Sequence, residues 1–335
     1  MPRLTVLMPA YNVGNYISEA IDSILNQTFA DFELLVIDDC STDNTAEIVN
    51  AYTDARIRYV KNEHNLGLAE NLNKGIQLAN TEYIARMDGD DISVSTCLEK
   101  QIQYLDNHPD VGICGVGFQF FGTRTSTVIY PEYFEEVKVR MLFGCTVILP
   151  MFHKSVFVEN NLKYKTSAFP AEDYMIWAEC LRVTKIYNLQ EVLFYYRMHE
   201  SQISTSRRAA QIIKTNEVRL FMLEYLSPDF SESEKLYFLD AFVPGKMESI
   251  VEFDHLQDFA RLLETKANTN FDHNALHTYL QNHLQQLMYS FALDRYFKNG
   301  FSLKSFFIYL VSKCVRVVPI KLTAKIFAKS VLNRK

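Results

Sequence analysis

The amino-acid sequence predicts an α/β protein, with a Rossmann-like and mostly parallel sheet flanked by helices and with an α-helical C-terminal extension. Two patterns lead to this prediction. Short apolar runs alternate with helically spaced apolar residues over the first hundred positions, and helical spacing alone continues from about residue 209 onward. Hydrophobic residues make up 48% of the chain and charged residues 22%, which is typical of a globular protein and excludes a disordered one.

Four strand–helix repeats occupy the first hundred residues. Short apolar runs predict buried strands at residues 4–8, 32–37, 57–60 and 83–87. Apolar residues that recur every three to four positions predict helices at 17–25, 46–49, 68–78 and 95–107. Strand–helix–strand units join parallel strands, so the carboxyl ends of these strands should meet at one edge of the sheet, where ligands bind in such folds.

The remainder of the chain is predicted to be mixed at first and then helical. A strand-like stretch follows Val111, and a helix at 172–183 and a strand at 192–198 come later. Further helices are expected at 209–226, 232–241, 255–267 and 275–298. We therefore expect an α/β domain at 1–205, a helical domain at 206–299 and a basic amphipathic helical tail at 300–335.

Charge is distributed unevenly along the chain. The formal net charge is −6, but residues 298–335 carry nine Lys or Arg and no Asp or Glu, which leaves a balance of −15 for residues 1–297. An acidic body does not suit a nucleic-acid partner, because such binding depends on basic contacts to phosphates. A basic and apolar tail suits the surface of a membrane.

Residues 301–332 contain two amphipathic segments separated by Pro319. Lys313 and Arg316 interrupt the apolar run after two turns, whereas a spanning helix needs about 20 mostly apolar residues. We therefore expect residues 301–335 to lie on a bilayer without crossing it. The alternative is a helical cap whose apolar face packs on the main domain.

The cysteines and the N-terminal residues predict the compartment. The six cysteines form no C-x-x-C pair, so no zinc site is indicated, and scattered thiols are typical of a reducing compartment. Residues 1–8 run directly into an apolar strand and show no signal-peptide pattern. We expect a cytoplasmic protein with peripheral contact to the inner face of the cytoplasmic membrane.

An acidic segment, Arg86-Met87-Asp88-Gly89-Asp90-Asp91, directly follows the fourth predicted strand. Three carboxylates within four residues repel one another unless a cation joins them. Oxygen ligands of this kind select Mg²⁺ or Mn²⁺, which commonly bridges carboxylates to substrate phosphates. The alternative, strongest for Asp91, is a solvated acidic turn before the helix at 95–107.

The first and second strands also end in residues suited to a ligand. Asp38 and Asp39 close the second strand and should face the same crevice as the acidic segment. Asp39 would accept hydrogen bonds from a base N–H or a ribose hydroxyl. The first strand ends in Pro9-Ala10-Tyr11-Asn12, which places an aromatic ring at the rim, where it could stack on a base.

Six motifs follow one another in a recognisable order. They are Pro9-Ala10-Tyr11-Asn12, Asp38-Asp39-x-Ser41-Thr42-Asp43-x-Thr45, Asn65-x-Gly67, Arg86-Met87-Asp88-Gly89-Asp90-Asp91, Ala171-Glu172-Asp173-Tyr174 and Tyr196-Arg197-Met198-His199-x-x-Gln202-x-Ser204. In this order they resemble glycosyltransferase family 2, the inverting enzymes with a GT-A fold. The resemblance covers residues 1–205, and residues 206–335 match no family we can name.

The resemblance implies a role for each matching position. The nucleotide-sugar site would consist of Pro9, Ala10, Tyr11, Asn12, Asp38, Asp39, Asn65, Gly67, Arg86, Asp88 and Arg197. A divalent metal, Mn²⁺ or Mg²⁺, would be held by Asp88, Asp90 and His199. Asp173 would be the catalytic base, although an acid there also suits a helix N-terminus, and helix geometry should point its neighbour Glu172 elsewhere.

The implied activity is transfer of a hexosyl or N-acetylhexosaminyl group from a nucleotide sugar, a UDP-sugar, to a glycan or lipid-linked acceptor by single displacement. An alternative is a catalytically silent sugar-nucleotide-binding subunit of a glycan-assembly complex. A nucleotidyltransferase is disfavoured, because it needs a Gly-rich basic loop after the first strand. Leu149-Pro150 stands where the family often has His-Pro, which leaves the acceptor-side loop open.

Overall fold

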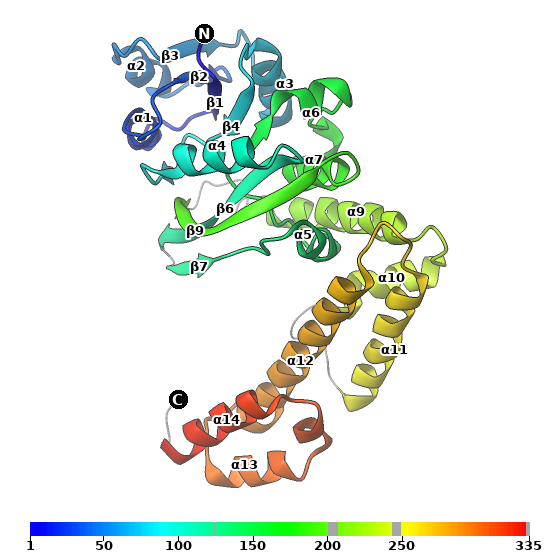
Figure 1. The fold of residues 1–335 in the computed structure, drawn as a ribbon. Coiled ribbons are helices and arrows are strands. Elements are labelled where there is room, and N and C mark those ends of the chain that lie inside the picture. Colours follow the sequence, from blue (N-terminus) through cyan, green and yellow to red (C-terminus); the bar gives the residue numbers. More distant parts are fainter. Residues whose placement is uncertain (124, 200–206, 243–248, 333–335) are drawn as a thin grey trace. The chain divides into compact units, whose positions relative to one another are not determined.

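The computed structural model describes residues 1–123, 125–199, 207–242 and 249–332 (Figure 1). Its internal contacts divide the chain into two compact units, residues 1–218 and 219–335, and the division falls within one helix, α9. The expected domain boundary between residues 205 and 206, and the motif residues Gln202 and Ser204, lie outside the described residues.

The first unit contains the sheet. Its described strands are β1 (Leu4–Ala10), β2 (Phe32–Asp38), β3 (Ile57–Lys61), β4 (Tyr83–Arg86), β5 (Ile92–Ser93), β6 (Val111–Gly122), β7 (Ser126–Val128), β8 (Met151–His153) and β9 (Lys185–Met198). Its described helices are α1 (Ile17–Leu25), α2 (Thr45–Asn50), α3 (Leu68–Leu78), α4 (Cys97–Asn107), α5 (Phe134–Arg140), α6 (Lys154–Glu159), α7 (Glu172–Cys180), the 3₁₀ turn η1 (Thr166–Ala168) and the beginning of α9 (Arg208–Leu226).

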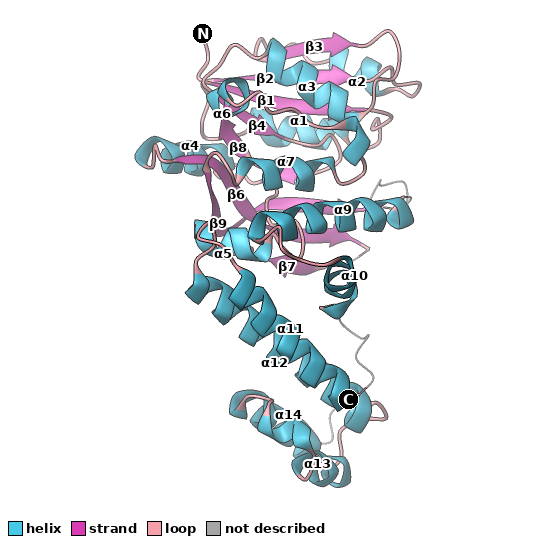
Figure 2. Cartoon of the chain, turned by 90° about the vertical axis from the view of Figure 1, so that its right-hand side faces the viewer, coloured by secondary structure: helices cyan, strands magenta, loops and turns pink. Residues whose placement is uncertain are grey.

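The strands form one mixed sheet in the order β3-β2-β1-β4-β8-β6-β9-β5, and β7 pairs with β6. β1, β2, β3 and β4 are mutually parallel, as are β6 and β9, whereas β8 runs antiparallel to both of its neighbours. Helices pack on both sides of the strands (Figure 2). The predicted Rossmann-like α/β fold is confirmed.

The amino-acid pattern explains why the central strands are buried. Every residue of β1 is buried, as expected of a parallel strand that helices cover on both faces. On α1, the buried residues Ile17, Ala20, Ile21 and Ile24 follow the i, i+3, i+4, i+7 pattern of one helix face. This packing brings the carboxyl ends of β1, β2 and β4 to one edge of the sheet, after Ala10, Asp38 and Arg86.

The second unit is helical throughout its described part. After the end of α9 it contains α10 (Glu232–Ala241), α11 (Ile250–Lys266), α12 (His273–Phe297), α13 (Leu303–Leu310), the 3₁₀ turn η2 (Lys313–Arg316) and α14 (Ile320–Leu332). α11 packs on α12, α12 on α13, and α13 on α14. Among the helices that the structure describes, none combines the length and the apolar character needed to cross a bilayer.

Candidate functional site

A cleft of about 670 Å³ opens at the carboxyl ends of β1, β2 and β4, within the range typical of small-molecule sites. Most of the residues that the sequence singles out line it: Pro9, Ala10, Tyr11, Asn12, Asp39, Asn65, Gly67, Arg86, Asp88, Asp90, Asp173 and His199. Asp38 and Arg197 do not. The cleft therefore gathers side chains from segments far apart in the sequence.

Asp39 fixes the loop that forms one wall of the cleft. Its carboxylate accepts hydrogen bonds from the backbone N–H groups of Leu66 (2.7 Å) and Gly67 (2.8 Å) and from Nδ2 of Asn62 (2.9 Å). Burial alone would raise the pKa of Asp39, but these hydrogen bonds outweigh it and lower that pKa below its usual value. Asp39 is therefore an ionised carboxylate at the cleft wall.

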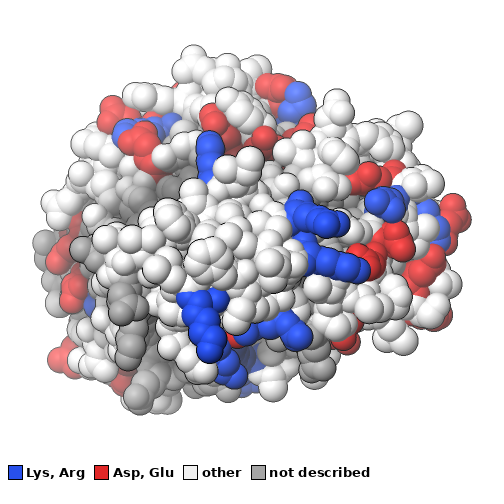
Figure 3. Space-filling view, turned by 90° about the horizontal axis from the view of Figure 1, so that it is seen from below, with Lys and Arg blue, Asp and Glu red and all other residues white. Residues whose placement is uncertain are grey.

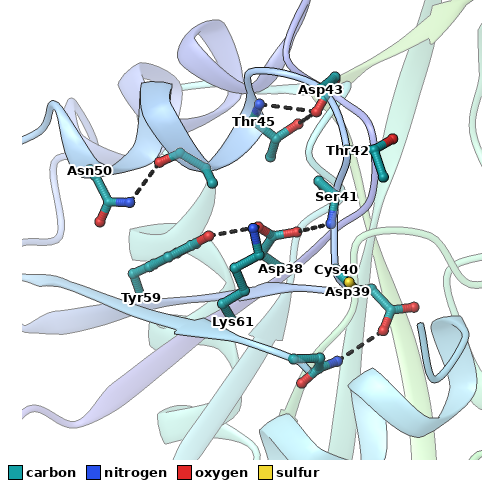
Figure 4. Close-up of polar contacts among 12 residues, drawn as sticks. Asp38, Asp39, Cys40, Ser41, Thr42, Asp43, Thr45, Asn50, Tyr59 and Lys61 are labelled. Carbon is teal, nitrogen blue, oxygen red and sulfur yellow. Dashed lines mark hydrogen bonds and ion pairs between the residues drawn. The ribbon is translucent and has the colours of Figure 1, made fainter. Parts of the chain in front are cut away.

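Asp38 points away from the cleft, so the expectation that both neighbouring acids face the crevice is wrong. Its carboxylate is fully buried and accepts hydrogen bonds from the Tyr59 hydroxyl (2.6 Å) and the Ser41 backbone N–H (2.8 Å) (Figure 4). Successive side chains of a strand point to opposite faces, and here Asp38, the last residue of β2, points away from the side on which Asp39 lines the cleft. Asp38 instead ties β2 to β3 and to the turn that follows β2.

The segment after β1 forms the rim of the cleft. Tyr11 is 50% exposed, so its ring is available for stacking. Asn12 adopts a left-handed backbone conformation (φ 53°), and its side-chain oxygen accepts a hydrogen bond from the Thr42 backbone N–H (2.9 Å). The Ser41 hydroxyl accepts one from the Asn12 backbone N–H (3.0 Å), so the turns after β1 and β2 hold each other in place.

Arg86 supplies the cation on the floor of the cleft. Its Nε and Nη2 donate to the two carboxylate oxygens of Asp88 at 3.0 and 3.1 Å, a bidentate pair. Burial would lower the pKa of Arg86, but the negative charges of Asp88 and, to a smaller extent, Asp173 raise this pKa well above its ordinary value. The guanidinium therefore stays charged beside the acidic segment.

Asp90 and Asp91 form a crowded acidic pair behind Asp88. Burial, followed by the charge of Asp88, raises the pKa of Asp90, and burial together with both neighbouring carboxylates raises that of Asp91. Oδ2 of Asp90 lies 3.0 Å from Nε2 of His199, which brings together two of the three predicted metal ligands. A cation would relieve the repulsion that raises these pKa values.

Arg197 lies beside the cleft and supports the acidic segment. Its backbone N–H donates to Asp91 Oδ1 (2.8 Å), and its Nε donates to the backbone carbonyl of Asp90 (2.7 Å). Its Nη2 lies 2.7 Å from Glu19 Oε2, and the guanidinium packs 4.9 Å from the ring centroid of Tyr16. Contact of Arg197 with a diphosphate stays a prediction.

Glu172 and Asp173, at the start of α7, both line the cleft, contrary to the expectation that helix geometry separates them. Burial raises the pKa of Asp173, partly offset by the charge of Arg86. Burial and the neighbouring Asp173 raise the pKa of Glu172 to about 7. Glu172 Oε2 is buried without a hydrogen-bond partner, which marks Glu172 as a candidate functional residue. The sequence alone gives Glu172 no role.

Leu149, which the sequence marks only as a departure from a His-Pro pair, lines the cleft in an unusual backbone conformation. It has a positive φ of 44°, which is strained for a leucine. Its carbonyl accepts a hydrogen bond from Nε2 of the buried Gln101 (2.8 Å), which holds the strained loop in place. No sequence signal marks a leucine for this conformation, and the loop holds the Leu149-Pro150 pair at which the sequence departs from the family that it resembles.

The atoms that could coordinate a metal decide whether the acidic segment suits one. Asp88, Asp90 and His199 all line the cleft and supply oxygen and nitrogen ligands. Within the described ranges, no three or more His, Cys, Asp or Glu side chains form a preformed metal cluster. A cation that binds through one or two carboxylates and the phosphates of a ligand needs no such cluster, so the residues present fit this mode.

Comparisons of this chain with a family model and with individual proteins agree on one family. The model described as Glycosyl transferase family 2 matches residues 5–162. An uncharacterized glycosyltransferase of Haemophilus influenzae is 32% identical over 222 residues, which cover 61% of this chain and 68% of that protein. WfaP of Escherichia coli, a UDP-Glc:alpha-D-GlcNAc-diphosphoundecaprenol beta-1,3-glucosyltransferase, is 28% identical over 223 residues, covering 65% of this chain and 86% of that protein.

A solved structure extends the likeness to the fold. Residues 1–349 of TarS from S. aureus, in complex with UDP-GlcNAc, align with a TM-score of 0.60 and 20% identity, covering 88% of this chain and 93% of that chain. This likeness confirms the expected GT-A fold. With the family model, the relative from H. influenzae and this fold in agreement, the chain belongs to glycosyltransferase family 2.

Proposed function

We propose that this protein is a metal-dependent inverting glycosyltransferase that uses a UDP-sugar. The observation that carries the proposal is that one cleft holds the Asp88 and Asp90 pair, a partly buried cation in Arg86, and Asp173. The pair and the cation suit a diphosphate, whereas a carboxylate with a raised pKa suits proton removal. A glycosyl transfer from a nucleotide sugar needs both functions.

The donor half of the cleft suits a nucleoside. The exposed ring of Tyr11 offers a stacking surface, and the ionised Asp39 holds the adjacent loop. WfaP is named for UDP-Glc, and the TarS structure contains UDP-GlcNAc, which supports uridine as the base here. The transferred group is then a hexosyl or N-acetylhexosaminyl unit.

Asp88, Asp90 and His199 would hold the metal, Mn²⁺ or Mg²⁺. When bound, such a cation acts as a Lewis acid toward the departing nucleoside diphosphate. Arg86, fixed by its bidentate pair with Asp88, adds positive charge at the same place without any need to rearrange. Asp90 is oriented by His199 at 3.0 Å.

Asp173 would accept the proton of the attacking hydroxyl. Burial raises the pKa of its carboxyl, which makes the carboxylate a better base, while the charge of Arg86 keeps it from being protonated too readily. The acceptor oxygen attacks the anomeric carbon from the face opposite the diphosphate. One displacement therefore inverts the anomeric configuration.

The acceptor is proposed to be a glycan or a lipid-linked glycan. WfaP, whose name includes a diphosphoundecaprenol-linked sugar, supports a lipid-linked acceptor. Leu149 and Pro150 line the cleft where an acceptor would approach Asp173, and the strain at Leu149 suits a loop shaped by function.

The test is donor hydrolysis by the whole protein, with UDP-glucose, UDP-galactose, UDP-GlcNAc, UDP-GalNAc and GDP-mannose in the presence of Mn²⁺. We expect Asp173→Asn to slow nucleotide release about 100-fold or more, the range of a lost general base. UDP affinity should change less than about twofold. Asp110→Asn, a change in the surface pair with Lys185, is the matched control and should behave as wild type.

Two results would contradict the proposal. If folded protein binds none of the donors, the cleft does not serve these nucleotide sugars. If Asp173→Asn releases nucleotide as fast as wild type, Asp173 is not the base. Donor binding without hydrolysis by either protein would favour the catalytically silent subunit.

A further inference from the structure

The helices α13 and α14 bury one apolar face and expose another. Phe306, Tyr309 and Ile326 are buried, and the Phe306 ring lies 5.1 Å from that of Phe327. The hydroxyls of Tyr309 and Thr323 are hydrogen-bonded at 2.9 Å. These contacts, together with the packing of α13 on α12, bury the inward faces of both helices. Helix–helix packing within this unit therefore does not explain the apolar residues that stay exposed.

The outward faces carry a concentration of large exposed apolar side chains. Nine of the 22 such residues in the described part of the chain fall between residues 303 and 332: Leu303, Phe307, Ile308, Leu310, Val311, Ile320, Phe327, Val331 and Leu332. Val311 is 88%, Ile320 87% and Phe307 65% exposed. Large exposed apolar side chains concentrated on two neighbouring helices are typical of an interaction site.

The residues of α14 outside its buried sector form an exposed apolar stripe and a lysine stripe, and the third lysine, Lys329, is half-buried over the Phe301 ring. Ile320, Phe327 and Val331 recur at i, i+7 and i+11, which places them on one side of the helix. Lys321, Lys325 and Lys329 recur at i, i+4 and i+8 and lie about 100–180° around the helix from Ile320, since each residue turns an α-helix by about 100°. Both stripes lie outside the sector that holds the buried Ile326 and Ser330.

The charge of this region is of one sign. The described residues 298–332 contain seven Lys or Arg and no Asp or Glu, in a chain whose net charge is −6. Figure 3 shows a broad uncharged surface bordered by Lys and Arg side chains on the face seen from below. An apolar stripe with lysines on one side of it fits the boundary between acyl chains and anionic headgroups, where the apolar side chains insert and the ammonium groups reach phosphates.

We propose that the exposed apolar and basic face of α13 and α14 binds the surface of an anionic lipid bilayer. The described helices are too short or too polar to span it, so the contact is peripheral. Insertion of Phe307, Val311 and Ile320 supplies the hydrophobic contribution, and the lysine stripe supplies attraction to anionic lipids. This inference goes beyond the proposed function and does not depend on it.

The test is co-sedimentation of the whole protein with vesicles of phosphatidylcholine and phosphatidylglycerol, and with vesicles of phosphatidylcholine alone. Wild type should partition onto the anionic vesicles at least about tenfold more strongly than onto the neutral ones. The triple variant Phe307→Asp, Val311→Asp, Ile320→Asp should lose this binding by about tenfold or more. Lys321→Gln, Lys325→Gln, Lys329→Gln should weaken it on anionic vesicles only.

The matched control is Leu236→Asp with Val251→Asp, which alters exposed apolar residues of α10 and α11 in the same unit and should bind vesicles as wild type does. UDP binding and thermal unfolding, measured on every variant, separate this test from that of the proposed function. Equal sedimentation of wild type and the triple variant would overturn the proposal. So would a dimer in lipid-free solution that the triple variant dissociates, because the face would then bind a second copy of the chain.

Discussion

Asp38 and Asp39 are adjacent acids with opposite surroundings. The carboxylate of Asp38 is enclosed by Tyr59 and Ser41, and that of Asp39 organises the loop that carries Leu66 and Gly67 at the cleft. The sequence predicts the strand end and its two acids. It does not reveal which of the two faces the cleft, because that depends on the register of β2 against β1 and β3.

Substitution of these two acids should therefore have different effects. Asp39→Asn replaces one carboxylate oxygen with an amide NH2 group, which cannot accept a hydrogen bond from a backbone N–H. The loop that carries Leu66 and Gly67 should then be held less firmly, and UDP affinity should fall about tenfold. Asp38→Asn should leave UDP affinity within about twofold but lower the free energy of unfolding by about 1–3 kcal/mol, because a buried acceptor is lost. Calorimetric titration and urea unfolding measure both quantities. Equal loss of UDP affinity in the two variants would refute the assignment.

Glu172 should make stability depend on pH. Its pKa is raised to about 7 in the folded protein, above the ordinary value of 4.5. Between these values the folded state holds a proton that the unfolded state releases, so stability falls as pH rises, by up to about 1.4 kcal/mol per pH unit from this group. Above the folded pKa both states are ionised and the loss is complete.

The variant Glu172→Gln cannot release this proton. Its stability relative to wild type should therefore increase as pH rises from about 5 to about 7.5, and then level off. Urea unfolding of both proteins across this range measures the difference. A difference that stays constant with pH would show that the pKa of Glu172 is not raised.

Helices and strands whose sequence pattern lies within the element itself are predicted most accurately. β1, β2 and β4 follow from apolar runs, and the helices α1, α3 and α12 from their spacing. The start of α11 at Ile250, five residues before the prediction, follows from Ser249, whose side chain accepts the Glu252 backbone N–H. Ser249-x-x-Glu252 is a helix-start signal, which the apolar spacing alone does not include.

Strands whose extent is set by pairing with residues far away in the sequence are harder to predict. β9 begins at Lys185, whereas the sequence predicts a strand only from 192, because polar residues such as Asn188 and Gln190 interrupt the apolar pattern. Pairing with β6 across several register shifts extends the strand. β5, β7 and β8 have two or three residues each, too few to show any periodicity.

The packing of α3 on β1 provides a test at this scale. A Cβ at Gly75 would lie 2.2 Å from Leu7 Cδ1 and 2.5 Å from its Cδ2, and Leu7 is buried in the sheet. Gly75→Ala should therefore lower the free energy of unfolding by about 1–3 kcal/mol despite the better helix propensity of alanine. Gln77→Ala, at an exposed position of the same helix, should change it by less than about 0.5 kcal/mol. Greater stability of Gly75→Ala than of wild type would contradict the close packing.

At the scale of the whole molecule, the chain separates an acidic body from a basic end. Residues 1–297 carry a balance of −15, and residues 298–335 carry nine basic and no acidic side chains. The sequence alone reveals this asymmetry and the two segments around Pro319. Only the structure shows that α13 and α14 retain exposed apolar residues after their inner faces have been packed.

Salt should therefore distinguish the two binding events. Raising the ionic strength from about 0.1 M to 1 M shortens the Debye length from about 10 to 3 Å, so binding to anionic vesicles should weaken several-fold. UDP binding in the cleft, where the charges of Arg86 and Asp90 are partly buried, should change much less. Sedimentation and calorimetry at the two salt concentrations measure this. Vesicle binding that is insensitive to salt would rule out a role for the lysine stripe.

The proposed activity requires the strand-end cleft to bind a uridine nucleotide through a divalent cation, which is the central claim. The most direct measurement is calorimetric titration of UDP into the whole protein with Mn²⁺ or with EDTA, for wild type, Asp90→Asn and the surface control Asp110→Asn. We predict that wild type and the control bind UDP with Mn²⁺, and that either EDTA or Asp90→Asn weakens binding at least about tenfold. UDP affinity that EDTA and Asp90→Asn both leave equal to that of wild type with Mn²⁺, or no UDP binding by folded wild type, would contradict the claim.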